Sequence, residues 1–293
     1  MKAIFGGLLL LFTASAALAE PQVRAVGCLS LTVADAERAA QFYTEVLQFA
    51  RAGERSWSDT AGARVRAVRL GLGRECVELR EFAPAGRAKP AGERSNDLSF
   101  QHMAIVVRDM DRAYARLRAA HVRQVSTEPQ RVPDWNPAAA GIRAFYFRDP
   151  DDHNLELIWF PAGKGAPRWQ APGDALFLGI DHTAIAVADT ARSVAFYRGL
   201  GLRVAGESEN WGPEQEHLNA VFASRVRITG LRAPDGPGIE LLEYLAPADG
   251  RPFPADLRPN DVAFWQTGLV AADGVAAAAL RDPDGHALAL EAP

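Results

Sequence analysis

The sequence predicts an α+β fold made of repeated units, each running from a strand through a helix into several further strands. Three observations support this prediction. Four segments of the chain resemble one another, apolar residues alternate with period two where segments begin, and tight-turn motifs precede the last strands of two of them. With 293 residues, of which 48% are hydrophobic, the chain is long enough for two domains with a core in each.

The four segments fall into two pairs. They cover residues 24–83, 96–160, 178–246 and 260–292. The first and third share an opening strand pattern and a Phe-Tyr pair, at 42–43 and 196–197. The second and fourth share an Asn-Asp start, at 96–97 and 260–261, and an Arg-Asp-Pro-Asp turn, at 148–151 and 281–284. We infer that a two-segment unit was duplicated.

The elements of a segment can be predicted from the second one. Residues 102–107 alternate as in a half-buried strand, and Asp109 is a suitable N-cap for a helix that carries Ala113, Leu117 and Ala120. The Asp-Pro-Asp turns then lead into a last strand. The fourth segment is truncated, because the residues between Ala271 and Val275 leave no room for a helix. Pro/Gly-rich stretches predict linkers at 83–95, 161–174 and 246–259.

The N-terminus has the pattern of a signal peptide. Lys2 is the only charge of residues 1–19, an apolar run covers residues 4–12, and Ala17 and Ala19 are the small residues that a signal peptidase requires. The apolar run is too short to span a membrane. We therefore expect cleavage after Ala19 and a periplasmic or secreted mature protein with no membrane attachment.

The charge pattern favours a small-molecule partner. The 32 basic and 36 acidic residues give a net charge of -4 and are interspersed along the chain. No run of like charges suggests a surface for nucleic acid or an anionic membrane.

On these repeats, Phe-Tyr pairs and Arg-Asp-Pro-Asp turns, the chain resembles the vicinal oxygen chelate superfamily, in a tandem four-module form. The family includes lactoylglutathione lyases, extradiol dioxygenases and bleomycin-binding proteins. The resemblance implies βαβββ modules that pair into cup-shaped mixed sheets around a divalent metal. It also implies two domains, at residues 20–160 and 178–293, with a linker at 161–177.

The resemblance also implies candidate metal ligands. Each module offers one position on its first strand and one on its last. In chain order these positions carry Cys28 and Glu78, His102 and Glu156, His182 and Glu240, and Gln266 and Ala289. Only the second and third modules have a full pair of ligands. If these two modules share a cup, as in some four-module lyases of the family, His102, Glu156, His182 and Glu240 form one site and the other cup is degenerate.

The chemistry of such a site follows from its ligand types. Two imidazoles and two carboxylates suit Zn²⁺, Ni²⁺, Mn²⁺ or Fe²⁺ and leave positions open for two vicinal substrate oxygens. The metal acts as a Lewis acid, and Glu156 or Glu240 moves a proton. This combination predicts a glyoxalase-like lyase or isomerase.

Two other functions remain open. If modules one and two, and three and four, pair instead, neither cup has the two histidines and one carboxylate of an extradiol dioxygenase. That activity is still the alternative enzyme, since one glutamate of the first arrangement could stand away from the metal. The chain could also be a non-catalytic drug-binding protein, with a cup lined by tryptophans, namely Trp57, Trp135, Trp211 and Trp265. His153 and His286 lie in the Asp-Pro-Asp turns, where we expect solvated side chains.

The resemblance finally implies a disulfide between Cys28 and Cys76. In a module of the family the first and last strands are neighbours. Cys76 lies two residues before Glu78, so it faces the same cup as Cys28. An exported chain also meets an oxidising compartment. The alternatives are two free buried thiols, or Cys28 as a metal ligand.

Overall fold

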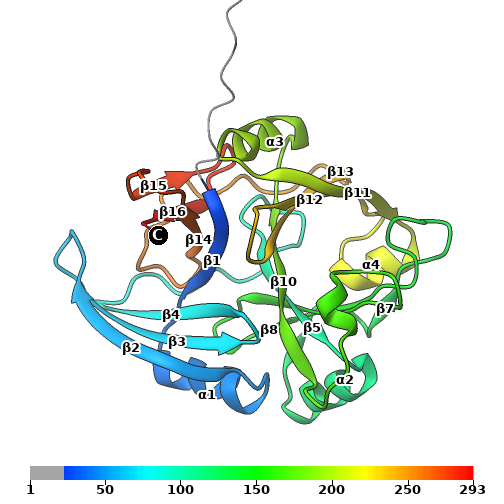
Figure 1. Ribbon diagram of the computed structural model, residues 1–293, viewed down its shortest axis with the longest axis horizontal. Coiled ribbons are helices and arrows are strands. Elements are labelled where there is room, and N and C mark those ends of the chain that lie inside the picture. Colours follow the sequence, from blue (N-terminus) through cyan, green and yellow to red (C-terminus); the bar gives the residue numbers. More distant parts are fainter. Residues whose placement is uncertain (1–22, 293) are drawn as a thin grey trace, which may run out of the picture.

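The structure is a computed structural model that describes residues 23–292, so the predicted signal peptide lies outside the described residues. It is a mixed α+β fold with two mixed sheets (Figure 1). No helix within residues 23–292 has the length and apolar character needed to cross a membrane.

The first and fourth segments together form a seven-stranded sheet. The first contributes one helix and four strands: β1 (Val23–Thr32), α1 (Ala36–Glu45), β2 (Ala50–Ser58), β3 (Arg64–Leu72) and β4 (Glu75–Ala83). The fourth contributes three strands: β14 (Trp265–Ala271), β15 (Ala278–Arg281) and β16 (Ala287–Glu291). The strand order is β15-β16-β14-β1-β4-β3-β2. As predicted, the fourth segment has no helix between β14 and β15.

The second and third segments form a nine-stranded sheet. The second contributes β5 (Gln101–Val107), α2 (Met110–Ala119), β6 (Arg123–Gln124), β7 (Gln130–Arg131), β8 (Arg143–Arg148) and β9 (Asn154–Trp159). A short 3-10 helix (Pro167–Gln170) precedes the third segment. That segment contributes β10 (Phe177–Ala186), α3 (Thr190–Gly199), β11 (Arg203–Trp211), α4 (Pro213–Asn219), β12 (Arg225–Arg232) and β13 (Gly238–Ala246). The strand order is β11-β12-β13-β10-β5-β9-β8-β6, with β7 paired to β8.

The two sheets are built by the same pairing rule. At the centre of each, the first strands of two segments run antiparallel, β1 with β14 and β5 with β10. Each first strand also pairs in parallel with the last strand of its own segment. Segments two and three therefore share one sheet, the arrangement that could bring their ligand positions together.

Three helices pack against the sheets, with α1 and α2 in the core that joins the two sheets. Asp35, Asp109 and Asp189 cap α1, α2 and α3 with their carboxylates, which confirms the predicted N-cap at Asp109. These helices contact β3, β9 and β13 respectively. The strand predicted at 102–107 exists, but the half-buried pattern is wrong, since every residue of β5 is buried. One of its faces packs in the core that joins the two sheets, and the other faces a cup.

The prediction of solvated histidines in the Asp-Pro-Asp turns is wrong. His153 and His286 are buried, because each turn packs beneath another segment. His153 Nδ1 lies 2.9 Å from Asp149 Oδ2, and its Nε2 lies 2.8 Å from the carbonyl oxygen of Val262. His286 Nε2 lies 3.0 Å from the carbonyl oxygen of Ala186. Both histidines therefore serve as structural links between segments.

Candidate metal centre

The strand register of the nine-stranded sheet places all four predicted ligands on one face. On β5 and β10, Ala104 pairs with His182 and Ala184 pairs with His102. Across the parallel pairs, Ala104 also faces Glu156 and Ala184 faces Glu240. Laterally paired residues share a face of a sheet, as do residues two apart on a strand. Two buried alanines thus form the floor of the site, and the four longer side chains stand around them.

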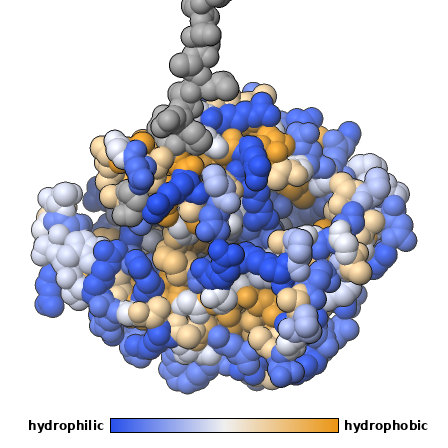
Figure 2. Space-filling model, viewed as in Figure 1, coloured by the Kyte–Doolittle hydropathy of each residue, from blue (hydrophilic) through white to orange (hydrophobic). Residues whose placement is uncertain are grey.

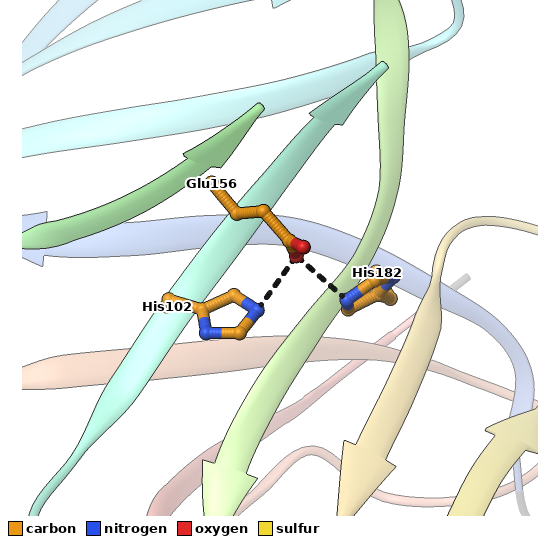
Figure 3. A group of neighbouring side chains, drawn as sticks. All are labelled: His102, Glu156 and His182. Atoms are coloured by element: carbon orange, nitrogen blue, oxygen red, sulfur yellow. Dashed lines mark ion pairs between the residues drawn. The ribbon is translucent and has the colours of Figure 1, made fainter. Parts of the chain in front are cut away.

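Three of these side chains meet (Figure 3). The Glu156 carboxylate lies between the two imidazoles, with Oε2 3.0 Å from His102 Nε2 and 3.4 Å from His182 Nε2. One ligand atom from each of the three residues lies within 4.8 Å of the others. All three side chains are buried.

Glu240 lies at the edge of this group. Its Oε2 is 3.3 Å from His182 Nε2, but its side chain is 29% exposed, compared with 6% for Glu156. Glu156 is therefore enclosed between the histidines, whereas Glu240 has one side open to solvent.

A second carboxylate orients His182. Asp181 lies at a break in the β5–β10 register, and its Oδ2 is 3.0 Å from His182 Nδ1. The carboxylate itself accepts hydrogen bonds from Trp169 Nε1 at 2.9 Å and from Arg232 Nη2 at 2.8 Å. Histidine ligands of metals commonly donate their second nitrogen to a carboxylate in this way. His102 has no such partner among the described residues.

The buried charges shift the ionisation of the two glutamates in opposite directions. Burial by itself raises the pKa of Glu156, but the contacts with His102 and His182 lower it to about 2. Burial raises the pKa of Glu240, and the negative charges of Glu156 and Asp181 raise it further, although His182 opposes them. Burial lowers the pKa of His182, but Glu240, Asp181 and Glu156 raise it well above its usual value.

The donor set fits a divalent metal. His102 Nε2 and His182 Nε2 are buried, lie beside carboxylate oxygens and make no hydrogen bond of acceptable geometry within the described chain. Two imidazole nitrogens and one or two carboxylate oxygens at this spacing are ligands typical of zinc, nickel, manganese and iron. Such an ion would satisfy the two nitrogens that the protein leaves without a partner.

A cavity and a cleft give access to the centre. The cavity has a volume of about 100 Å³ and is lined by Glu156, His182 and Glu240 of the centre and by apolar side chains of β8, β12 and α4. The adjoining cleft has a volume of about 400 Å³, and its charged lining residues are Asp181, Glu207, Arg232 and Glu240. Glu240 lines both spaces, so it faces any molecule that moves from the cleft into the cavity.

The remaining family positions lie apart from this centre, in the seven-stranded sheet. Cys28 and Cys76 are joined there by a disulfide, with 4.7 Å between their Cα atoms. Glu78 is buried among arginines, and Gln266 accepts a hydrogen bond from Arg80. Neither Cys28 nor Glu78 approaches the histidines.

The four tryptophans do not line one cup. Trp265 belongs to the core, and Trp57 lies on β2 of the seven-stranded sheet. Trp135 and Trp211 contact each other at a tilt, with 3.9 Å between ring centroids, and line a small pocket that shares Val132 and Leu218 with the cavity. The sequence interpretation missed Asp181, Trp169 and Arg232. An acidic residue directly before a candidate histidine was the available signal for Asp181, whereas no signal marked the other two.

Comparison with known proteins agrees with this fold. The family model described as Glyoxalase/Bleomycin resistance protein/Dioxygenase superfamily matches residues 25–157 and 179–290, which is most of the chain. The protein belongs to this superfamily. Its mixed α+β architecture is the fold of the glyoxalase structures.

Three similar chains share between 15% and 33% sequence identity with this protein. A 2-epi-5-epi-valiolone epimerase from Actinomyces sp is 33% identical over 156 residues, which cover 49% of this chain and 83% of the epimerase. A glyoxalase I variant from Zea mays superposes with a TM-score of 0.60 at 16% identity and covers 91% of both chains. Another structure of Zea mays glyoxalase I gives a TM-score of 0.56 at 15% identity, again over 91% of both chains. At these identities the superpositions show the fold alone.

Proposed function

We propose that the protein is a metal-dependent enzyme that moves a proton on a small substrate with two vicinal oxygens, as a glyoxalase-like lyase or an isomerase. The observation that carries the proposal is the group of three buried ligand atoms from His102, Glu156 and His182, with Glu240 beside it. The epimerase relative supports proton transfer, since epimerisation inverts one carbon centre of a small molecule.

The site residues divide into those that would hold the metal ion and one that would act on the substrate. His102, Glu156 and His182 would hold the divalent ion, and Asp181 would fix the ring of His182. When bound, the ion would polarise the two vicinal oxygens of the substrate as a Lewis acid. Glu240 would be the general base, because its partly exposed carboxylate lines both the cleft and the cavity. Glu156 lines the cavity but not the cleft, and its carboxylate is enclosed by two imidazoles.

Isotope exchange tests this function without a known product. Mature protein is analysed for zinc, nickel, manganese and iron, and then incubated in D₂O with a panel of α-hydroxy ketones. Proton NMR should show that one class of these ketones exchanges the hydrogen on the carbon next to its carbonyl group. Glu240→Gln should keep its metal and slow that exchange by a factor of about 10² to 10⁴. Glu207→Gln, which removes an exposed carboxylate from the same cleft, is the matched control. Metal-free protein, or equal rates in both variants, would contradict the proposal.

A second candidate is an extradiol-type dioxygenase. It is favoured by one observation: the close group has two histidines and one carboxylate, with Glu240 at its edge. That ligand set with open positions is typical of non-haem iron oxygenases. Oxygen consumption with catechols by iron-loaded protein would support this candidate, and Glu240→Gln would then have little effect.

We further propose that the chain is a tandem four-module member of the superfamily that is exported after cleavage at Ala19. The sequence repeats and the shared pairing rule of the two sheets support the first part, and the composition of residues 1–19 supports the second. N-terminal sequencing of protein recovered from the periplasm or the medium, expected to begin at Glu20, tests export.

A further inference from the structure

The seven-stranded sheet has a face equivalent to the one that carries the metal centre. Ser30 on β1 pairs with Glu78 on β4 and with Gln266 on β14, as Ala104 pairs with Glu156 and His182 in the other sheet. Figure 1 shows this sheet curled, with β2 and β15 at its two ends both lying on the same side of β1. The face is therefore a second cup, without histidines.

Three arginines surround the single carboxylate at its centre. Glu78 is buried and pairs with Arg55 through two contacts, at 2.9 Å and 3.2 Å. Arg80 Nε donates to the same carboxylate at 2.8 Å, and Arg69 Nη2 lies at 3.4 Å. Glu291 on β16 also attracts Arg55. Even with Glu291 counted, the cup holds more cations than anions, so positive charge remains uncompensated.

Two of these arginines can reach a ligand. The side chains of Arg55 and Arg69 are 55% and 47% exposed, whereas that of Arg80 is 16% exposed and is engaged by Gln266. A guanidinium has five N–H donors, and Glu78 accepts only part of those of Arg55 and Arg69. The remaining donors face solvent on the cup side, held in place by a buried anion.

The cup also has a row of small residues and an aromatic side chain beside the arginines. The strand register puts Gly268 opposite Ala289, and Ala289 opposite Ala279, so three small residues lie in one row beside Gln266 and Glu291. Trp57 lies two residues from Arg55 on the same face of β2, with its ring centroid 4.6 Å from the Arg55 guanidinium. An apolar or aromatic body could rest against this ring while its charged end meets the arginines.

We propose that this second cup binds a small organic oxyanion, a carboxylate or a phosphate ester, through Arg55 and Arg69. Glu78 and Arg80 are positioning residues, because Glu78 contacts both guanidinium groups and Arg80 donates to Glu78. The proposal is independent of the metal centre, which lies in the other sheet.

Calorimetric titration with two probes tests the proposal. Inorganic phosphate represents the phosphate headgroup, and benzoate represents a carboxylate with an aromatic body. Wild-type protein should bind at least one of them at a single saturable site, and the stronger probe identifies the chemistry. Arg55→Gln and Arg69→Gln should each weaken that binding by about tenfold, because each removes a charge-assisted hydrogen bond. Arg55→Lys keeps the charge without the fork and should give an intermediate loss.

The matched control is Arg66→Gln. Arg66 lies on the same strand as Arg69 but on the opposite face, where it pairs with Glu54 and Glu37. This variant removes the same charge and should bind the probe within about twofold of wild type. The proposal is overturned if wild type binds neither probe saturably, or if Arg66→Gln weakens binding as much as Arg69→Gln. Circular dichroism of each variant confirms that the fold is intact before titration.

Discussion

The equivalent faces of the two sheets carry opposite chemistry on the same backbone register. In the nine-stranded sheet, two imidazoles and acidic groups converge, a set suited to a cation. In the seven-stranded sheet, three guanidinium groups converge on one buried carboxylate, a set suited to an anion. Both have the same first-strand and last-strand pairing. The comparison shows that the same strand pairing can bring side chains of opposite charge together, depending on the few residues at the equivalent positions.

Removing one imidazole should have the largest effect on the difference between the two faces. His182→Ala should lower metal affinity by at least about 100-fold, since a ligand is lost and not only its orienting partner. Gln266→Ala, at an equivalent first-strand position of the other sheet, should leave metal content unchanged. Elemental analysis and chelator competition measure both variants. Equal metal loss in the two variants would show that the cups are not chemically distinct.

The disulfide should distinguish how the two sheets are stabilised. Cys28 and Cys76 are separated by 48 residues, so Cys28→Ser/Cys76→Ser should reduce the free energy of unfolding by about 2 to 4 kcal/mol. Hydrogen exchange should show that reductant loosens β1 and β4, whereas a chelator loosens β5 and β10. Before either experiment, mass spectrometry of unreduced mature protein should find no alkylatable thiol. Two alkylatable thiols would show that the disulfide is absent and would contradict this difference in how the sheets are stabilised.

Altering the Asp181 carboxylate beside His182 should lower the metal affinity less than removing the imidazole itself. Asp181→Asn keeps the side-chain size but weakens the contact with Nδ1, so metal affinity should fall by about 10- to 100-fold. Asp235→Asn, an exposed acid that pairs with Arg74, is the control for loss of charge. Chelator competition gives both affinities. If Asp181→Asn binds metal like wild type, the orientation of His182 must come from packing alone.

Glu156 and Glu78 occupy equivalent positions and should respond differently to the same change. Glu78→Gln should reduce the free energy of unfolding by about 1 to 2 kcal/mol, because Arg80 loses a charged acceptor while Arg55 and Arg69 can hydrate. It should not affect metal content. Glu156→Gln should lose metal, since an amide is a poorer ligand than a carboxylate. Urea denaturation and elemental analysis of both variants check this contrast, and metal loss from Glu78→Gln would contradict it.

The fold was predictable because its signals are local and repeated. Asp109 as a helix cap, the Asp-Pro-Asp turns and the missing helix after Ala271 depend on neighbours in the sequence. The four candidate ligand positions followed from the family resemblance, carried over residue by residue onto the repeats. The structure places His102, Glu156 and His182 together because β5 and β10 pair at the centre of one sheet.

Residues whose role depends on contacts between distant segments could not be predicted. Arg232 and Trp169 reach Asp181 from β12 and from the 3-10 helix, and no spacing rule relates them. His153 was misjudged for the same reason. A turn is usually exposed, but this one packs under the residues that precede β14, where the carbonyl of Val262 accepts from the imidazole.

Replacing His153 should have the smallest effect, which is a change in how the stability of the protein depends on pH. Burial lowers the pKa of His153, but Asp149 raises it more, so the net shift is upward. For Asp149 the net shift is downward, because His153 and backbone donors lower its pKa more than burial raises it. A histidine with a raised pKa in the folded state stabilises the protein fully below its unfolded pKa, and this contribution is lost as pH rises through the folded value. The depressed pKa of Asp149 acts in the other direction, so its contribution is lost only at acidic pH. Urea denaturation should therefore show that the stability advantage of wild type over His153→Gln is largest between about pH 4 and about pH 6 and shrinks toward pH 9. A constant difference across this range would mean that the Asp149–His153 contact stabilises the turn between β8 and β9 without a buried charge.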